Sequence, residues 1–195
     1  MLKIFASVSL DFDKKALYNE AMKMEHKESI KDVVRDFRLP RYHEIPNVGL
    51  YLEQTTKYVN SCLAPLGFDE ITNSMVRNYV KMGLVANPVK KQYSEDQLAH
   101  IITIALLKQV TPLENIRELY RLQEERYSVE VAYDYFCTEL ENVLLHRFGY
   151  KSDLEDIGVT STMIKEMLRS AIVAVSHIIY LNACFEGVRE PEKNG

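Results

Sequence analysis

Apolar residues recur every three or four positions along most of the chain, the spacing that places them on one face of a helix. This pattern predicts helices over 13–24, 29–37, 50–63, 72–82, 94–110, 113–126, 128–148 and 161–185. Prolines and glycines separate several of these segments, among them Pro40, Pro65, Gly83 and Gly149. We therefore expect an all-α protein with at most a small β-wing.

Capping residues indicate where some of these helices begin and end. Thr72 is a suitable N-cap for the helix that follows it, and Gly83 suits the left-handed position just beyond its end. Ser94 to Gln97 fit a capping box, and the sequence from Thr111 to Glu114 fits a second one with proline at the first helical position. The helix from 98 to 110 is apolar on most sides, so we expect it to be central and buried.

The last predicted helix is the most apolar part of the chain. Its centre, AIVAVSHIIYLNACF, has about fifteen residues and includes Ser176, His177 and Asn182. A membrane span needs roughly 20 residues of a more uniformly apolar kind. We therefore expect a buried or dimer-forming helix and no membrane partner.

The overall composition is ordinary, but the charges are unevenly distributed along the chain. The chain is 47% hydrophobic and 27% charged, with a net charge of −4, as in an ordinary soluble protein. Residues 71–93, however, carry Arg77, Lys81, Lys90 and Lys91 and no acidic residue. This segment would confine a polyanion to one surface of an otherwise acidic chain. The alternative is that these cations are simply a solvated face.

The order of elements around this basic segment is typical of a winged helix-turn-helix that binds DNA. A helix over 50–63, the loop APLGFDE and a second helix with a polar outer face are followed by the Lys90-Lys91 turn. Arg77 and Asn78 could reach base edges, because arginine and asparagine offer paired donors. We assign phosphate contacts, or places on the same polar face, to Thr72, Asn73, Ser74, Lys81, Lys90, Lys91 and Gln92. Tyr79 and Tyr93 are expected in the core.

Catalytic and metal-binding patterns are weak. No GxSxG, HExxH, GxxxxGK[ST] or GxGxxG motif is present, so we expect neither an enzyme nor a cofactor. His177 with Cys184, or Cys137 with His146, could contribute to a soft-metal or thiol sensor, but single histidines and cysteines are more often core residues. We expect no metal site. The odd number of cysteines and the short apolar N-terminus indicate a reduced, cytoplasmic setting with no signal peptide.

The segment from Thr72 to Ile116 resembles the winged-helix domain of MerR-type transcription regulators. Arg77 to Leu84 stand where that family has Arg-Tyr-Tyr-Glu-x-x-Gly-Leu, and Tyr93-Ser94-Glu95-Asp96 match the close of its wing. The departures are Asn78 in place of an aromatic residue, Lys81 in place of an acid, a very short wing, and a start about forty-five residues into the chain. Residues 40–120 are also similar to an uncharacterised bacterial family, the domain of unknown function 1836, thought to be MerR-like.

The resemblance implies a helical N-terminal arm at 1–44, a MerR-like winged helix-turn-helix at 45–110, and a helical dimerisation or effector region at 111–195. It implies a cytoplasmic transcription regulator that binds duplex DNA as a homodimer, with a small-molecule effector possible. Four phosphate contacts give a salt slope of only about −3.6 per protomer, which also favours a dimer on two half-sites. The alternative is a protein–protein interaction module that kept this fold and lost DNA binding.

Overall fold

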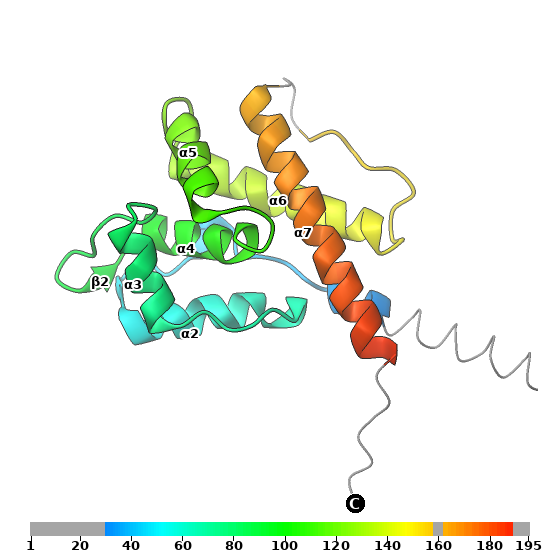
Figure 1. Cartoon of the computed structure of the whole chain (residues 1–195), viewed down its shortest axis with the longest axis horizontal. Helices are drawn as coiled ribbons and strands as arrows, with labels where there is room; N and C mark the ends of the chain where they lie inside the picture. Colours follow the sequence, from blue (N-terminus) through cyan, green and yellow to red (C-terminus); the bar gives the residue numbers. More distant parts are fainter. Residues whose placement is uncertain (1–29, 158–161, 189–195) are drawn as a thin grey trace, which may run out of the picture.

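The computed structural model describes residues 30–157 and 162–188, and within them the chain is helical with one minimal sheet (Figure 1). Residues 30–35 are helical and are followed by the 3-10 helix η1 (Tyr42–Glu44). The further elements in chain order are β1 (Leu50–Tyr51), α2 (Leu52–Leu63), the 3-10 helix η2 (Ala64–Leu66), α3 (Asn73–Lys81), β2 (Gln92–Tyr93), α4 (Glu95–Leu107), α5 (Leu113–Glu124), α6 (Val129–Arg147) and α7 (Met163–Val188). The all-α prediction is confirmed, whereas the helix predicted over 13–24 lies outside the described residues.

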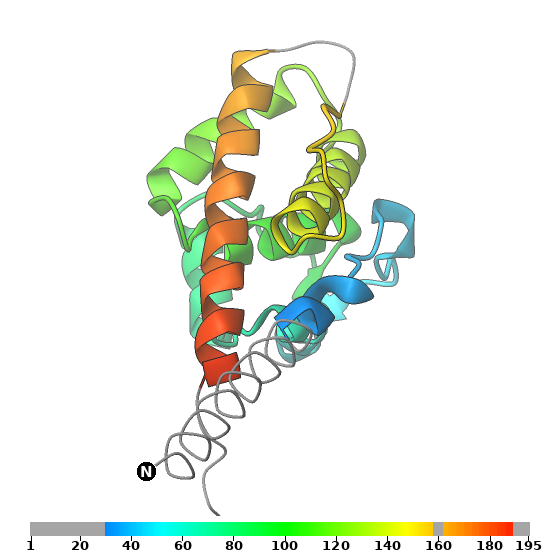
Figure 2. The same cartoon turned by 90° about the vertical axis from the view of Figure 1, so that its right-hand side faces the viewer.

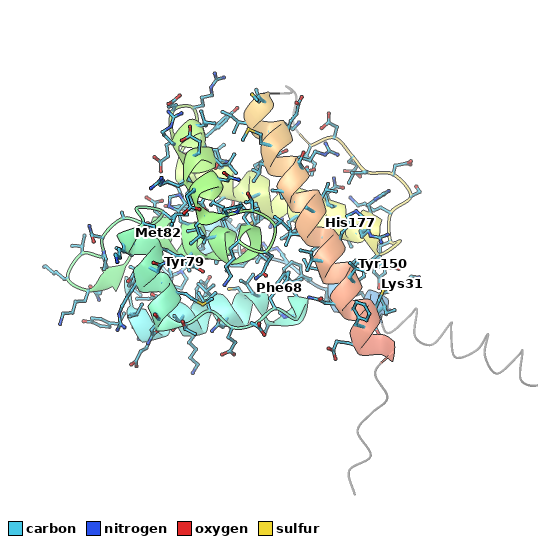
Figure 3. All side chains as sticks on the ribbon, viewed as in Figure 1. Lys31, Phe68, Tyr79, Met82, Tyr150 and His177 are labelled. Carbon is cyan, nitrogen blue, oxygen red and sulfur yellow. The ribbon has the colours of Figure 1, made fainter. Side chains whose placement is uncertain are left out.

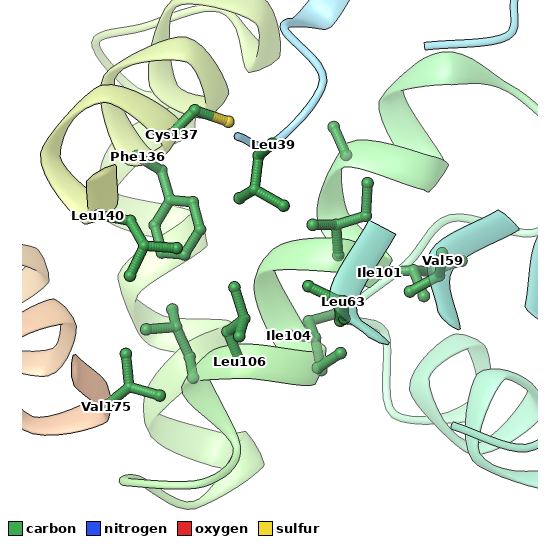
Figure 4. Close-up of a cluster of buried hydrophobic side chains, with 14 of the residues drawn as sticks. Leu39, Val59, Leu63, Ile101, Ile104, Leu106, Phe136, Cys137, Leu140 and Val175 are labelled. Atoms are coloured by element: carbon green, nitrogen blue, oxygen red, sulfur yellow. The ribbon is translucent and has the colours of Figure 1, made fainter. Parts of the chain in front are cut away.

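Helix α4 lies at the centre of the fold, as its apolar composition predicts. Leu98, Ile101, Ile102 and Leu106 on different sides of α4 are all fully buried. Figure 4 shows why: side chains of α4 meet Val59 and Leu63 of α2 on one side and Phe136 and Leu140 of α6 on the other. Burying an aliphatic side chain of this size contributes roughly 1.5–3 kcal/mol, so α4 holds the N-terminal and C-terminal halves of the fold together in one core.

Helices α2 and α3 are joined by a short, tightly held connection. Asn60 of α2 donates from Nδ2 to the carbonyl oxygen of Ile71 at 3.0 Å and accepts from the amide of Ile71 at 2.9 Å. Two residues later, at the first residue of α3, Asn73 Oδ1 accepts from Thr56 Oγ1 at 2.9 Å. These contacts hold the start of α3 against α2, so the two helices have a defined relative geometry.

Residues 37–41, which have no regular secondary structure, form with η1 a strap across α6. The Leu39 side chain is fully buried, and the backbone amides of Leu39 and Tyr42 donate to carboxylates of Glu141 and Asp134, both on α6. The Tyr42 hydroxyl donates to Asp96 Oδ1 of α4 at 2.6 Å. The strap therefore attaches the N-terminal part of the described chain to two core helices.

Helix α7 runs along one side of the molecule for most of its length (Figures 1 and 2). Leu168, Ile172, Val175 and Ile179 on one of its faces are buried, and α7 packs mainly against α6. Among the described residues, α7 is also the one helix that is long and apolar enough to cross a membrane, with a mean hydropathy of 1.5 in an 18-residue window within Met163–Glu186. In this fold its inner face is part of the core.

Some boundaries differ from those that the sequence predicts. The helix predicted over 50–63 starts at Leu52, because Leu50 and Tyr51 pair with Tyr93 and Gln92 as strands. Thr111 does not cap α5, since Pro112 already holds the extended cap position. The side chain of Thr162 accepts from the amide of Lys165 at the start of α7, while the predicted cap Ser161 lies outside the described residues.

Candidate nucleic-acid interface

Helix α3 is a short helix with both of its ends well defined. Thr72 Oγ1 accepts from the amide of Met75 at 3.2 Å, which confirms Thr72 as the N-cap. At the other end Gly83 has φ = 73°, and the amide of Leu84 donates to the Tyr79 carbonyl oxygen at 3.0 Å. This bond spans the left-handed residue, as in a Schellman motif. The ends of α3 are therefore satisfied within the protein, and its outer face is free to meet a ligand.

The two faces of α3 divide as the sequence predicts. Val76 and Tyr79 are buried, and burial raises the pKa of Tyr79 to about 12. Figure 3 labels Tyr79 and Met82, which lie on the side of α3 that packs on the body of the protein. The opposite face is exposed and polar, and consists of Ser74, Arg77, Asn78 and Lys81. This arrangement presents donors to solvent without any acidic residue between them.

A tight hairpin follows α3 and carries two lysines at its tip. The amide of Val89 donates to the carbonyl oxygen of Gln92 at 3.1 Å, and the amide of Gln92 donates back to Val89 at 2.9 Å. Lys90 and Lys91 between them have φ values of 51° and 67°. Such a two-residue turn is of type I′, which usually contains Asn-Gly. A lysine in this conformation costs roughly 1 kcal/mol. Both lysines are therefore held at the hairpin tip in a strained backbone conformation.

The hairpin is held at its base by strands and by one glutamine. Gln92 and Tyr93 pair antiparallel with Tyr51 and Leu50, so β2 returns alongside the start of α2. Gln97, in the first turn of α4, accepts from the amide of Ser94 at 2.8 Å and donates from Nε2 to the Ala86 carbonyl oxygen at 2.6 Å. One buried side chain thus closes the loop from 86 to 94 at both of its ends.

A groove of about 700 Å³ runs between the start of α2, the exposed face of α3 and the hairpin. Arg77 and Lys91 lie on its walls, from α3 and from the hairpin tip. The remaining lining residues are Tyr51, Leu52, Glu53, Gln54, Asn73, Val80, Pro88 and Tyr93. The structure therefore brings together, at one groove, cations that are fourteen positions apart in the sequence.

The predicted site residues do not all lie free on this surface. Thr72, Ser74, Arg77, Asn78, Lys81, Lys90 and Lys91 are exposed. Asn73 is half-buried and its Oδ1 is used by Thr56 of α2, while Gln92 is half-buried in the sheet. Asn78 donates to Met82 Sδ at 3.4 Å, so its amide lies along the helix and would have to turn to reach a base.

Sequence reasoning missed the contribution of β1 and of the first turn of α2. Tyr51 is 53% exposed at the edge of the groove, and Glu53 adds the one carboxylate to its lining. Arg117 of α5 was also missed: its Nη1 donates to the Met82 carbonyl oxygen at 3.4 Å, beside the end of α3. The only available signal was the apolar pair Leu50-Tyr51 before a helix start, which is too short to predict a strand.

Electrostatic effects at the groove are modest. Burial raises the pKa of Tyr93, and the nearby Arg77 guanidinium opposes that rise because it favours the phenolate. This places the Arg77 charge close to Tyr93, at the junction of α3 and β2. Tyr79 and Tyr93 are both buried, which confirms them as core residues.

The histidines and cysteines singled out in the sequence are not gathered into one group by the fold. Within residues 30–157 and 162–188, no group of three or more His, Cys, Asp or Glu side chains is placed to hold a metal ion. Cys137 is buried, and burial raises the pKa of its thiol to about 12, so it is unreactive at neutral pH. A cavity lined by residues of α4, α5, α6 and α7, beside His100 and Tyr120, has about 20 Å³, room for roughly one water.

Residues 40–136, which include α2, α3 and the hairpin, match the protein family described as Domain of unknown function (DUF1836). The match confirms the family resemblance seen in the sequence, and it extends through η1 and α2 to the first half of α6. No curated protein and no solved structure matches the chain.

Proposed function

We propose that this protein is a cytoplasmic transcription regulator that binds duplex DNA through α3 and the Lys90-Lys91 hairpin, on a MerR-like winged helix-turn-helix. The observation that carries the proposal is the hairpin tip, where two adjacent lysines occupy strained left-handed conformations beside the exposed basic face of α3. Strained residues that the surrounding structure holds in place concentrate at functional sites. A fold that needed only a turn would gain stability from Asn-Gly at this position.

The proposed DNA contacts are of two kinds, contacts to base edges and contacts to phosphates. Arg77 lies on the wall of the groove, where its guanidinium can offer a forked pair of donors to guanine O6 and N7. Ser74 and Lys81 on α3, and Lys90 and Lys91 on the hairpin, are exposed on either side and suit phosphate oxygens. Phosphate contacts of this number give modest affinity from one protomer, so the protein would bind two half-sites as a homodimer.

The test is fluorescence anisotropy with random-sequence duplex DNA between about 50 and 200 mM salt, where electrostatic binding changes steeply. The wild-type protein is compared with Arg77→Ala/Lys91→Ala and with Arg126→Ala, which removes an exposed cation after α5. Micromolar binding that weakens with salt, falls at least tenfold in the double variant and is unchanged in Arg126→Ala supports the proposal. A folded protein that shows no binding at the lowest salt refutes it.

A second function is favoured by the apolar character of the groove. Tyr51 at its edge and Val89 of the hairpin are 53% and 74% exposed, and Leu52, Val80 and Pro88 line it. An apolar floor between two cations also suits a peptide with an apolar anchor and acidic flanks, that is, a protein–protein interaction module. Absence of DNA binding together with pull-down of a partner that Tyr51→Ala abolishes would favour this function over the first.

A further inference from the structure

Tyr42 of η1 makes hydrogen bonds to two different core helices. Its backbone amide donates to Asp134 Oδ1 of α6 at 2.8 Å, and its hydroxyl donates to Asp96 Oδ1 of α4 at 2.6 Å. The second bond has the length of a charge-assisted hydrogen bond to a carboxylate. Burial and the bond to Asp96 raise the pKa of Tyr42, so its hydroxyl stays protonated and acts as the donor. One residue of the strap therefore joins α6 to the first turn of α4.

The first turn of α4 also holds the hairpin. Asp96 is followed directly by Gln97, whose side chain accepts from the amide of Ser94 at 2.8 Å and donates to the Ala86 carbonyl oxygen at 2.6 Å. Both bonds come from one side chain, so a displacement of the first turn would move both ends of the loop from 86 to 94. The first turn of a helix opens most readily, because its amides have no partners within the helix. A contact that fixes this turn from outside therefore also fixes the hairpin.

The rest of α4 does not need this contact. Leu98, Ile101 and Ile102 are fully buried, so they hold the body of the helix in the core. Asp96 is exposed in the turn before them, and its carboxylate is held by the Tyr42 hydroxyl, which comes from a distant part of the chain. Loss of this hydroxyl should therefore loosen the first turn of α4 and leave the core intact.

We propose that Tyr42 is a positioning residue for the hairpin: its hydroxyl fixes the first turn of α4 and, through Gln97, the place of Lys90 and Lys91. The proposal deepens the proposed function and rests on it only for the consequence, which is DNA binding. The geometry itself is a property of the free protein, so it can be tested without DNA. The alternative is that the Tyr42–Asp96 bond adds only to the stability of the whole fold.

The test is amide hydrogen exchange of the full chain without DNA, followed by NMR. Tyr42→Phe removes the hydroxyl and keeps the ring. The amides of Val89, Gln92 and Ser94, which close the hairpin, are expected to exchange about tenfold faster, as for the loss of a hydrogen bond to a charged group. The amide of Lys108, at the other end of α4, should exchange as in the wild type.

Tyr120→Phe is the matched control, because the Tyr120 hydroxyl also donates to α4, at the His100 carbonyl oxygen at 3.2 Å. This bond reaches the middle of the helix, so its loss should leave hairpin exchange unchanged. Asp96→Asn keeps an oxygen acceptor and should stay close to the wild type, whereas Asp96→Ala should match Tyr42→Phe. The double variant Tyr42→Phe/Asp96→Ala should have no larger effect than either single variant, because both remove the same bond.

Two results would overturn the proposal. One is hairpin exchange that is unchanged in both Tyr42→Phe and Asp96→Ala. The other is an equal acceleration of all amides, including that of Lys108, since a bond that only stabilises the fold would act in this way. A local effect at the hairpin in a protein that binds no DNA keeps the positioning role and removes only the proposed function. If DNA binds as proposed, Tyr42→Phe should also associate with a duplex more slowly at unchanged net charge.

Discussion

Arg41 on the strap and Glu141 on α6 form a two-pronged ion pair, with Nη1 to Oε1 at 2.7 Å and Nη2 to Oε2 at 2.6 Å. Both side chains are mostly buried, at 21% and 17% exposed. The hydrogen bonds that Arg41 donates to Glu141 raise the pKa of Arg41 above its usual value. The same carboxylate accepts from the Leu39 amide at 3.2 Å, so it fixes both the backbone and a side chain of the strap.

Removing one partner of this pair should destabilise the protein. Arg41→Ala leaves Glu141 partly buried without its counter-charge, and we expect the free energy of unfolding to fall by about 2–3 kcal/mol. Urea unfolding measures this. Arg38→Ala is the matched control, because the Arg38–Glu44 pair is exposed and should leave the urea midpoint unchanged. Equal effects of the two changes would contradict this account.

Replacing Lys90-Lys91 by Asn-Gly should separate stability from binding. Asn-Gly suits the type I′ turn, so the double variant should be more stable by about 1–2 kcal/mol, as seen in its thermal midpoint. It also removes two cations, so DNA affinity should fall in the same protein. A variant that is more stable and binds DNA as tightly as the wild-type protein would show that Lys90 and Lys91 do not contact DNA.

Arg77 and Lys81 should respond differently to alanine substitution. Arg77→Ala should lower the preference for the cognate sequence by about 1–3 kcal/mol, because a forked base contact is lost. Lys81→Ala should weaken binding to all sequences alike and reduce the salt slope by about 0.9. Competition binding with specific and random duplexes distinguishes the two outcomes, and an identical loss in both variants would argue against base contact by Arg77.

Gly49 and Gly83 both have left-handed backbone conformations but different surroundings. A Cβ at Gly83 (φ = 73°) meets nothing within 4 Å, so Gly83→Ala should cost only the backbone strain, about 1 kcal/mol. At Gly49 (φ = 74°) it would lie 3.1 Å from Gln92 Cβ, so Gly49→Ala should cost more and should also disturb β2. Chemical unfolding of both variants measures the two losses in the free energy of unfolding. A smaller loss for Gly49→Ala than for Gly83→Ala would show that β1 and β2 can move apart at little cost.

Glu139 on α6 is fully buried 3.1 Å from the Arg169 guanidinium, and burial raises its pKa although Arg169 and Lys165 oppose the rise. A carboxyl whose pKa is higher in the folded chain binds protons more readily there than in the unfolded chain. Stability from this group is therefore present below its unfolded pKa, about 4.3, and is lost as pH rises through the folded value. Glu139→Gln should gain stability relative to wild type between pH 4 and pH 7, measured by urea midpoints. A difference in urea midpoint between the two proteins that stays constant from pH 4 to pH 7 would show that Glu139 does not titrate in this range.

Local pattern predicted much of this fold. The N-cap at Thr72, the glycine after α3, the buried sides of α4 and the polar face of α3 all follow from side-chain chemistry within a few residues. The β1–β2 pair could not be predicted, because two-residue strands are defined by a partner some forty positions away. Lys90 and Lys91 were predicted as site residues from charge, whereas their strained conformation appears only in three dimensions.

The closure of the hairpin by Gln97 has a consequence for how fast a ligand is captured. A flexible wing would have to lose conformational entropy at each encounter, typically 1–2 kcal/mol for each residue that becomes ordered. Here one glutamine, anchored on the most deeply buried helix, holds both ends of the loop before any ligand arrives. The lysines at the tip are thus presented in a single geometry, so their charge can speed association as well as strengthen the complex. Gln97→Ala should slow the association rate even where the net charge of the surface is unchanged.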